Sequence, residues 1–139
     1  MALFSAILWP STGRMGHAQE DHGLSRNTCV SCPDSPNYVS TKSPDPDRAM
    51  SPLPYVGTRE QSHECLILVL RDMKRCTIIT ADPGYIHAEF RSALFGFVDD
   101  VDSIFDDNER LIHFRSTSRT GYYDFGANRK RMKEISERY

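Results

Sequence analysis

Two short segments of the chain, residues 85–91 and 111–117, alternate apolar residues with histidine, glutamate and arginine. A period of two places every second side chain on the same face of a β-strand. If the two segments lie in one sheet, their polar positions share a face. The residues we expect on this face are His87, Glu89, Arg91, His113 and Arg115, with some of Asp99, Asp100 and Asp102 nearby.

This set of residues is compatible with three kinds of chemistry. Two histidines with carboxylates could bind a metal ion or perform acid–base catalysis. Arg91 and Arg115 would compete with a cation for the same carboxylates. The third interpretation is a solvated or protein-binding face with cross-strand ion pairs. We favour it, because half-exposed antiparallel sheets usually have such a face.

A second polar group lies toward the C-terminus and could form an anion pocket at the start of the last helix. It would need three segments to converge. Its members are Arg115, Ser116, Ser118, Arg119, Asn128 and Arg129.

Charge is unevenly distributed along the chain. Residues 99–109 hold six acids and no base, and residues 129–139 hold five bases and two acids. The basic stripe could bind phosphate, lipid headgroups or RNA, or it could be a solvent face that pairs with the acidic turn. The net charge of −2 favours the solvent face, and we expect no nucleic-acid partner.

Recognisable catalytic and cofactor motifs are missing from the sequence. There is no Gly-x-Ser-x-Gly, phosphate-binding loop, dinucleotide fingerprint or His-Glu-x-x-His. Of the four cysteines only Cys29 and Cys32 are close together, whereas a zinc site needs a second such pair. We therefore expect no catalytic residues, no metal and no cofactor, although an enzyme is not excluded.

Residues 58–139 have sequence patterns typical of helices and strands. Thr58 and Gln61 form a capping-box signature before a helix over 59–74. Strands are expected at 76–80, 85–91, 97–105 and 111–117, with a turn at Asp82-Pro83-Gly84 and a last helix over 127–138. The order α-β-β-β-β-α predicts an α+β fold, with a four-stranded antiparallel sheet and two helices on one face.

The first part of the chain has a different composition. Seven of the eight prolines lie between Pro10 and Pro54, so we expect an extended, proline-rich arm there. The longest apolar run, Leu66 to Leu70, is too short to span a bilayer. The first 19 residues contain no Asp or Glu, which is typical of organelle-targeting segments but also fits an ordinary N-terminus.

Several blocks of the sequence resemble the family known as domain of unknown function 1499. The blocks are Cys32-Pro-Asp-Ser-Pro-Asn-Tyr-Val-Ser-Thr, Ser51-Pro-Leu-Pro-Tyr, Tyr85-Ile-His-Ala-Glu-Phe-Arg-Ser-Ala-Leu-Phe-Gly-Phe-Val-Asp-Asp, His113-Phe-Arg-Ser-Thr-Ser-Arg-Thr-Gly-Tyr and Asp124-Phe-Gly-Ala-Asn-Arg-Lys-Arg. They cover about 32–139. Members of the family usually have Cys where this chain has Tyr38, so any role of that thiol is lost here.

The resemblance implies a domain over 32–139, made of an extended lead-in (32–57) and a core (58–139), behind an N-terminal arm or tether (1–31). It implies bacterial or organellar relatives but no established activity. Signature positions of the family that match this chain are His87, Glu89, Arg91, Phe95, Asp99, Asp100, Arg115, Ser116, Ser118, Arg119, Gly121, Asn128 and Arg129.

Two functional hypotheses follow. In the first, the chain is a non-catalytic accessory or assembly subunit of a membrane-associated, respiratory-type complex in the mitochondrion. It would bind protein subunits through its arm and polar sheet face, and a plastid photosynthetic complex is the alternative host. In the second, the polar face binds a small ligand, an anion, a lipid headgroup or a metal, or acts as an enzyme, through His87, Glu89, Asp100, His113 and Arg115.

Overall fold

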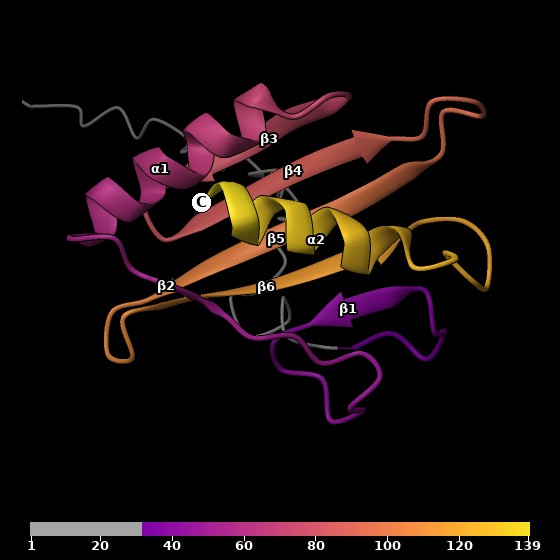
Figure 1. Cartoon of the computed structure of the whole chain (residues 1–139), viewed down its shortest axis with the longest axis horizontal. Coiled ribbons are helices and arrows are strands. Elements are labelled where there is room, and N and C mark those ends of the chain that lie inside the picture. The colour runs from indigo at the N-terminus through magenta and orange to yellow at the C-terminus, as the bar shows by residue number, and fades with distance from the viewer. Residues whose placement is uncertain (1–31) are drawn as a thin grey trace, which may run out of the picture.

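The computed structural model describes residues 32–139, which form a two-layer α+β domain with both helices on one face of an antiparallel sheet (Figure 1). The sheet has six strands in the order β1-β6-β5-β4-β3, and β2 pairs with β6 beside β1. The N-terminal arm predicted over 1–31 lies outside the described residues. The elements are β1 (Tyr38–Ser40), β2 (Leu53–Pro54), α1 (Arg59–Asp72), β3 (Cys76–Asp82), β4 (Tyr85–Arg91), β5 (Val98–Asp106), β6 (Leu111–Ser118) and α2 (Ala127–Arg138).

Helix α1 begins at the predicted capping box. The Thr58 hydroxyl accepts a hydrogen bond from the Gln61 backbone at 3.1 Å, and the Gln61 side chain accepts one from the Thr58 backbone at 2.9 Å. Two of the free donors at the helix start are thereby satisfied. The helix ends at Asp72, two residues before the predicted end, because Met73 is extended and Arg75 is left-handed (φ 57°) as the chain turns into β3.

Strands β3 to β6 form the predicted antiparallel meander. Pro83 and Gly84 make the two-residue turn between the paired residues Asp82 and Tyr85. A β-bulge interrupts β3 between Ile78 and Thr80, at the outer edge of the sheet. Strand β4 has the predicted bounds, and the other three strands differ from the predicted ones by one or two residues at one or both ends.

The prediction of four strands is wrong, because the lead-in adds two more. Strand β1 pairs with β6 through Val39 and Ser116, and β2 pairs with β6 through Leu53 and Ile112. These strands have three and two residues and lie among prolines, which remove backbone donors. A period-two pattern cannot be recognised over two or three residues. The sequence therefore predicts an extended lead-in here and no strands.

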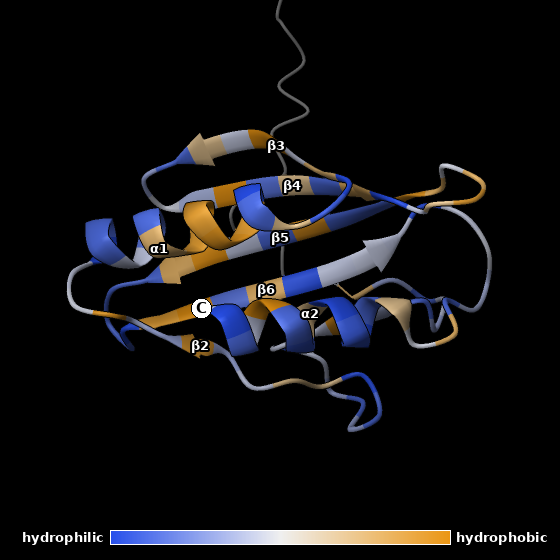
Figure 2. Ribbon diagram, turned by 45° about the horizontal axis from the view of Figure 1, so that its top comes forward, coloured by the Kyte–Doolittle hydropathy of each residue, from blue (hydrophilic) through white to orange (hydrophobic). Residues whose placement is uncertain are grey.

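One continuous core lies between the helices and the sheet. Alternation puts Ile86, Val101 and Ile112 on the helix side of three neighbouring strands, and each is at most 1% exposed. Apolar residues of α1 and α2, including Leu66 and Ile135, cover them. The outward surface of α2 is largely hydrophilic, whereas α1 has an apolar turn between hydrophilic ends (Figure 2). Within residues 32–139 no helix has the length and hydropathy needed to cross a membrane.

Replacing Leu66 with alanine should destabilise the domain by about 3 kcal/mol. Leu66 is 1% exposed, and its truncation leaves a cavity between α1 and the sheet. The matched control is Leu68→Ala on the same helix, where the side chain is 65% exposed and the change should stay within about 0.5 kcal/mol. Chemical denaturation of both variants measures the difference, and equal losses would contradict the assigned orientation of α1.

Candidate functional site

A buried carboxylate, Asp102 on β5, lies at the centre of the polar face, by which we mean the sheet face turned away from the helices. Its side chain is 1% exposed. One oxygen, Oδ1, accepts hydrogen bonds from the Tyr85 hydroxyl at 2.7 Å and from His87 Nδ1 at 2.8 Å. The other oxygen accepts one from Arg115 at 3.0 Å. The sheet register brings these groups together, because Asp102 lies directly opposite His87 on β4 and Arg115 on β6.

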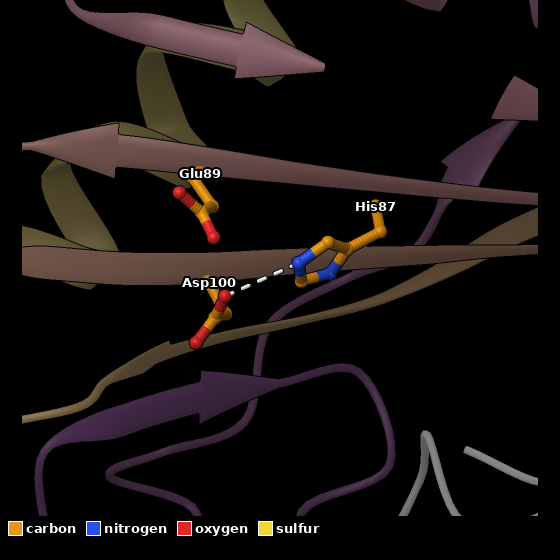
Figure 3. Close-up of side chains that lie close together, drawn as sticks. All are labelled: His87, Glu89 and Asp100. Atoms are coloured by element: carbon orange, nitrogen blue, oxygen red, sulfur yellow. Dashed lines mark ion pairs between the residues drawn. The ribbon is translucent and has the colours of Figure 1, made fainter. Parts of the chain in front are cut away.

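A second carboxylate, Asp100, lies two residues earlier on the same strand and face. The Nε2 atom of His87 lies 3.2 Å from Asp100, so the imidazole bridges the two aspartates. Arg119 holds Asp100 through Nε and Nη2, both at 2.7 Å, and also donates to Glu89 at 2.6 Å. Figure 3 shows His87, Glu89 and Asp100 turned toward one another from β4 and β5.

The two aspartates keep His87 positively charged. Hydrogen bonds to Asp100 and then Asp102 raise the pKa of His87 from 6.5 to about 9, although burial opposes the charge. Burial also disfavours ionisation of both carboxylates. The hydrogen bonds from His87 and the arginines outweigh it, and the pKa values of Asp100 and Asp102 are lowered.

The resulting network is balanced in charge. Its acids are Glu89, Asp100 and Asp102, and its cations are His87, Arg115 and Arg119. Buried charges are tolerated when each is paired and hydrogen-bonded. In this arrangement both nitrogens of His87 are used as donors at neutral pH, so the imidazole cannot accept a proton from a substrate.

Among residues 32–139, two groups of side chains have ligand atoms close enough together to surround a metal ion. In the first, the atoms of His87, Glu89 and Asp100 lie within 4.8 Å of one another, but a cation would have to displace Arg119. The second is Asp106, Glu109 and His113, at the turn between β5 and β6 and the beginning of β6. There Asp106 already accepts hydrogen bonds from two backbone amides of its own turn.

The structure divides the predicted site residues into separate groups. Six of them meet on the polar face: His87, Glu89, Arg91, Asp100, Arg115 and Arg119. Arg91 lies at the edge of this group, 3.4 Å from Glu89. His113 belongs to the same face but bonds elsewhere, to Thr41 at 3.1 Å and Glu109 at 2.9 Å.

Three other predicted residues, Asp99, Ser116 and Asn128, lie on the helix side of the sheet. Asn128 is fully buried at the start of α2, and its oxygen accepts from Ser116 at 2.6 Å and from Arg131 at 2.8 Å. Its amide nitrogen donates to the Asn37 carbonyl at 3.0 Å. Arg131 also pairs with Asp99 at 2.5 Å. This network fastens α2 to β6 and to the lead-in.

The proposed anion pocket is therefore not assembled from the residues named for it. Arg115 and Arg119 belong to the polar face, whereas Ser116 and Asn128 lie on the opposite side, as consecutive residues of a strand must. Arg129 points to a third place, where it donates to the carbonyls of Asp47 and Ala49.

Sequence reasoning did not identify four residues in or beside these networks. Asp102 was expected only near the polar face, and Tyr85, Thr117 and Arg131 were not singled out. The alternation of β5 could have identified Asp102, because residues 100 and 102 share a face that residue 99 does not. The Thr117 hydroxyl is buried on the polar face opposite Asp100, with no hydrogen-bond partner in the described part of the chain.

These features define a small α+β domain whose polar sheet face is organised by ion pairs around a buried aspartate. The chain belongs to the family described as "Protein of unknown function (DUF1499)", whose model matches residues 29–138. No curated protein and no solved structure is matched by the chain.

Replacing His87 with glutamine should remove a pH-dependent part of the stability. A raised pKa stabilises the folded state fully below pH 6.5, and the contribution is lost as the pH rises through about 9. The difference in unfolding free energy between wild type and His87→Gln should be on the order of 2 kcal/mol near pH 6. It should shrink toward zero by about pH 10.

Denaturation curves at several pH values measure this difference. His63→Gln is the control. His63 lies on α1 and hydrogen-bonds to the Asp82 carbonyl at the end of β3, so it is not part of the network. Its stability should fall with pH as that of the wild type does. A difference for His87→Gln that does not change between pH 6 and pH 10 would contradict the charged state of His87.

Replacing Asn128 with alanine should destabilise the domain by about 2–4 kcal/mol, because it leaves buried polar groups without partners. Lys130→Ala, on the exposed side of the same helix, should have little effect. Thermal and chemical unfolding measure both changes. Near-wild-type stability of Asn128→Ala would show that α2 is held in place by its apolar contacts alone.

Proposed function

We propose that this domain is a non-catalytic accessory or assembly subunit of a larger, membrane-associated complex of respiratory type in the mitochondrion. The observation that carries the proposal is the balanced ion-pair network. Its acids, its two central arginines and His87 are bound to one another. Such a face suits recognition and stability better than proton transfer.

The groups that catalysis would need are already engaged. His87 is held as a cation between two aspartates, and Asp102 is shielded from solvent. At the rim, Arg91 and Arg119 have side chains that are about half exposed, 56% and 46%. Exposed arginines suit bidentate contacts with carboxylates of a partner subunit.

The organelle is proposed from the sequence. The first 19 residues contain no acid, and the family resemblance favours compartments of bacterial ancestry. A plastid photosynthetic complex is the alternative host for the same role. The arm by which the subunit would be tethered lies outside the described residues.

Binding of a small anion or a metal ion at the polar face is a second candidate function. The observations in its favour are the unsatisfied Thr117 hydroxyl beside Asp100 and the grouping of His87, Glu89 and Asp100. Calorimetric titration with phosphate and with zinc tests it directly. Binding that is lost in Glu89→Gln would favour this function over the accessory role.

The accessory role predicts that the tagged full-length chain co-migrates with a large complex on native gels of its source organelle. Deleting residues 2–28 should release it, because the deletion removes the proposed tether and leaves the family-matched region intact. A longer deletion to residue 50 would be uninformative, since it also removes β1 and part of the buried network.

The identity of the co-purified subunits assigns the complex and the organelle. An unfolding temperature equal to that of the full chain is the control for the deletion. Migration of the full-length chain as a free small protein in every membrane fraction would rule out the accessory role.

A further inference from the structure

Two loops at one end of the sheet expose an unusual amount of apolar surface. Six of the nine large hydrophobic side chains exposed in the described part of the chain lie in them. One loop, residues 92–97, joins β4 to β5, and the other, residues 119–126, joins β6 to α2. We call them the aromatic loops. Their exposed residues are Leu94, Phe95, Phe97, Tyr122, Tyr123 and Phe125.

The two loops are neighbours in space, because both continue strands that pair with each other. The Arg119 amide donates to the Val98 carbonyl at 3.1 Å, and Asp99 lies opposite Ser118. The β4–β5 loop stands out as an apolar tip at the end of the sheet in Figure 2. Together they form one surface at the end of the domain.

The side chains protrude from the domain. Phe125 is 99% exposed and Leu94 is 81% exposed. The backbone imposes the position of Phe125, since this residue and Gly126 are both left-handed, with φ of 52° and 78°. A bulky residue in this conformation is strained, and a side chain that is 99% exposed gains almost no burial within the domain to offset the strain.

Several exposed cations lie around this end: Lys74, Arg75, Arg91 and Lys130. Acids close to them are paired or hydrogen-bonded. Glu89 pairs with Arg91, Asp72 with Arg138 and Asp99 with Arg131, and Asp124 accepts hydrogen bonds from Gly126 and Asn128.

The opposite end of the sheet is acidic. Its turns carry the acids Asp82, Asp106, Asp107 and Glu109, against the two arginines Arg59 and Arg110. The described domain is therefore polarised along its strands, with aromatic side chains and exposed cations at one end and carboxylates at the other.

We propose that the aromatic loops insert into the interface of an anionic lipid bilayer. Leucine and phenylalanine side chains suit the apolar side of the membrane interface. A tyrosine ring can be buried at the headgroup level while its hydroxyl stays in water. Exposed lysines and arginines around them are attracted to anionic headgroups, and the acidic end is turned away. A fluid surface accepts two protruding loops without the matching cavity that a protein partner would need.

This inference does not rest on the accessory role, because lipid vesicles contain no partner subunit. The full-length protein should co-sediment with vesicles of phosphatidylcholine and phosphatidylglycerol. Binding to pure phosphatidylcholine should be weaker, and added salt should reduce the difference.

The variant Leu94→Ser/Phe95→Ser should weaken vesicle binding by about tenfold or more, since two apolar anchors are lost. Leu68→Ser/Ile79→Ser is the matched control, because both side chains are exposed but lie outside the aromatic loops. It should bind as the wild type does. Phe125→Trp, which keeps an aromatic anchor, should retain binding.

Charge and the N-terminal segment are tested separately. Lys74→Glu/Lys130→Glu should abolish most of the preference for anionic vesicles. Eight of the first nine residues are themselves apolar. A chain with Phe4, Ile7 and Leu8 changed to serine should still bind, because the proposed contact is made by the aromatic loops.

Three results would overturn the proposal. The wild type could fail to sediment with either kind of vesicle, the two loop substitutions could bind unchanged, or only the N-terminal variant could lose binding. The variant with substituted loops could still co-purify with a complex although it no longer binds vesicles or binds them unchanged. Such co-purification would support the accessory role independently of the membrane contact.

Discussion

Burial of the Asp102 carboxylate is the constraint on which the polar half of this domain depends. An ionised carboxylate away from water must be met by donors on each oxygen. Asp102 obtains them from the strands on either side of its own, through Tyr85, His87 and Arg115. Because these bonds cross the sheet, they fix the register of β4, β5 and β6 as firmly as the backbone ladder does.

The same pairing explains why His87 is a cation and not a base. Its second nitrogen pairs with Asp100, which also accepts hydrogen bonds from Arg119. Positive and negative side chains therefore alternate from Asp102 through His87 and Asp100 to Arg119. A group of histidine, aspartate and glutamate resembles a catalytic or metal site when it is considered by residue type alone. In this structure the members are paired with one another and with arginines, and this pairing is visible only once donors and acceptors are placed.

The sequence was informative where a pattern extends over many residues. The capping box at Thr58, the alternation of 85–91 and the C-terminal helix at 127–138 all have local physical causes, and each agrees with the structure. Strands β1 and β2 have no such local signal, since their formation depends on the free edge of β6. The hydrogen bond between Asn128 and Asn37 joins segments that are distant in the sequence. No local pattern of residues predicts such a contact.

The candidate site shows the same limit in finer detail. Period-two alternation correctly grouped His87, Glu89 and Arg115, because side-chain direction within a strand is a local property. Asp99 and Ser116 were grouped with them on sequence proximity, although a one-residue step places them on the other face of the sheet. Arg119 lies beyond the end of β6, and its return to Asp100 depends on the loop conformation.

The attachment of the lead-in to β6 and α2 has a consequence for biosynthesis. A chain leaves the ribosome from its N-terminus, but Val39 pairs with Ser116, and Asn37 bonds to Asn128. These contacts span most of the domain, so the first strand has no partner until nearly the whole chain has been translated. The sheet therefore cannot close around β1 until β6 and α2 have been synthesised.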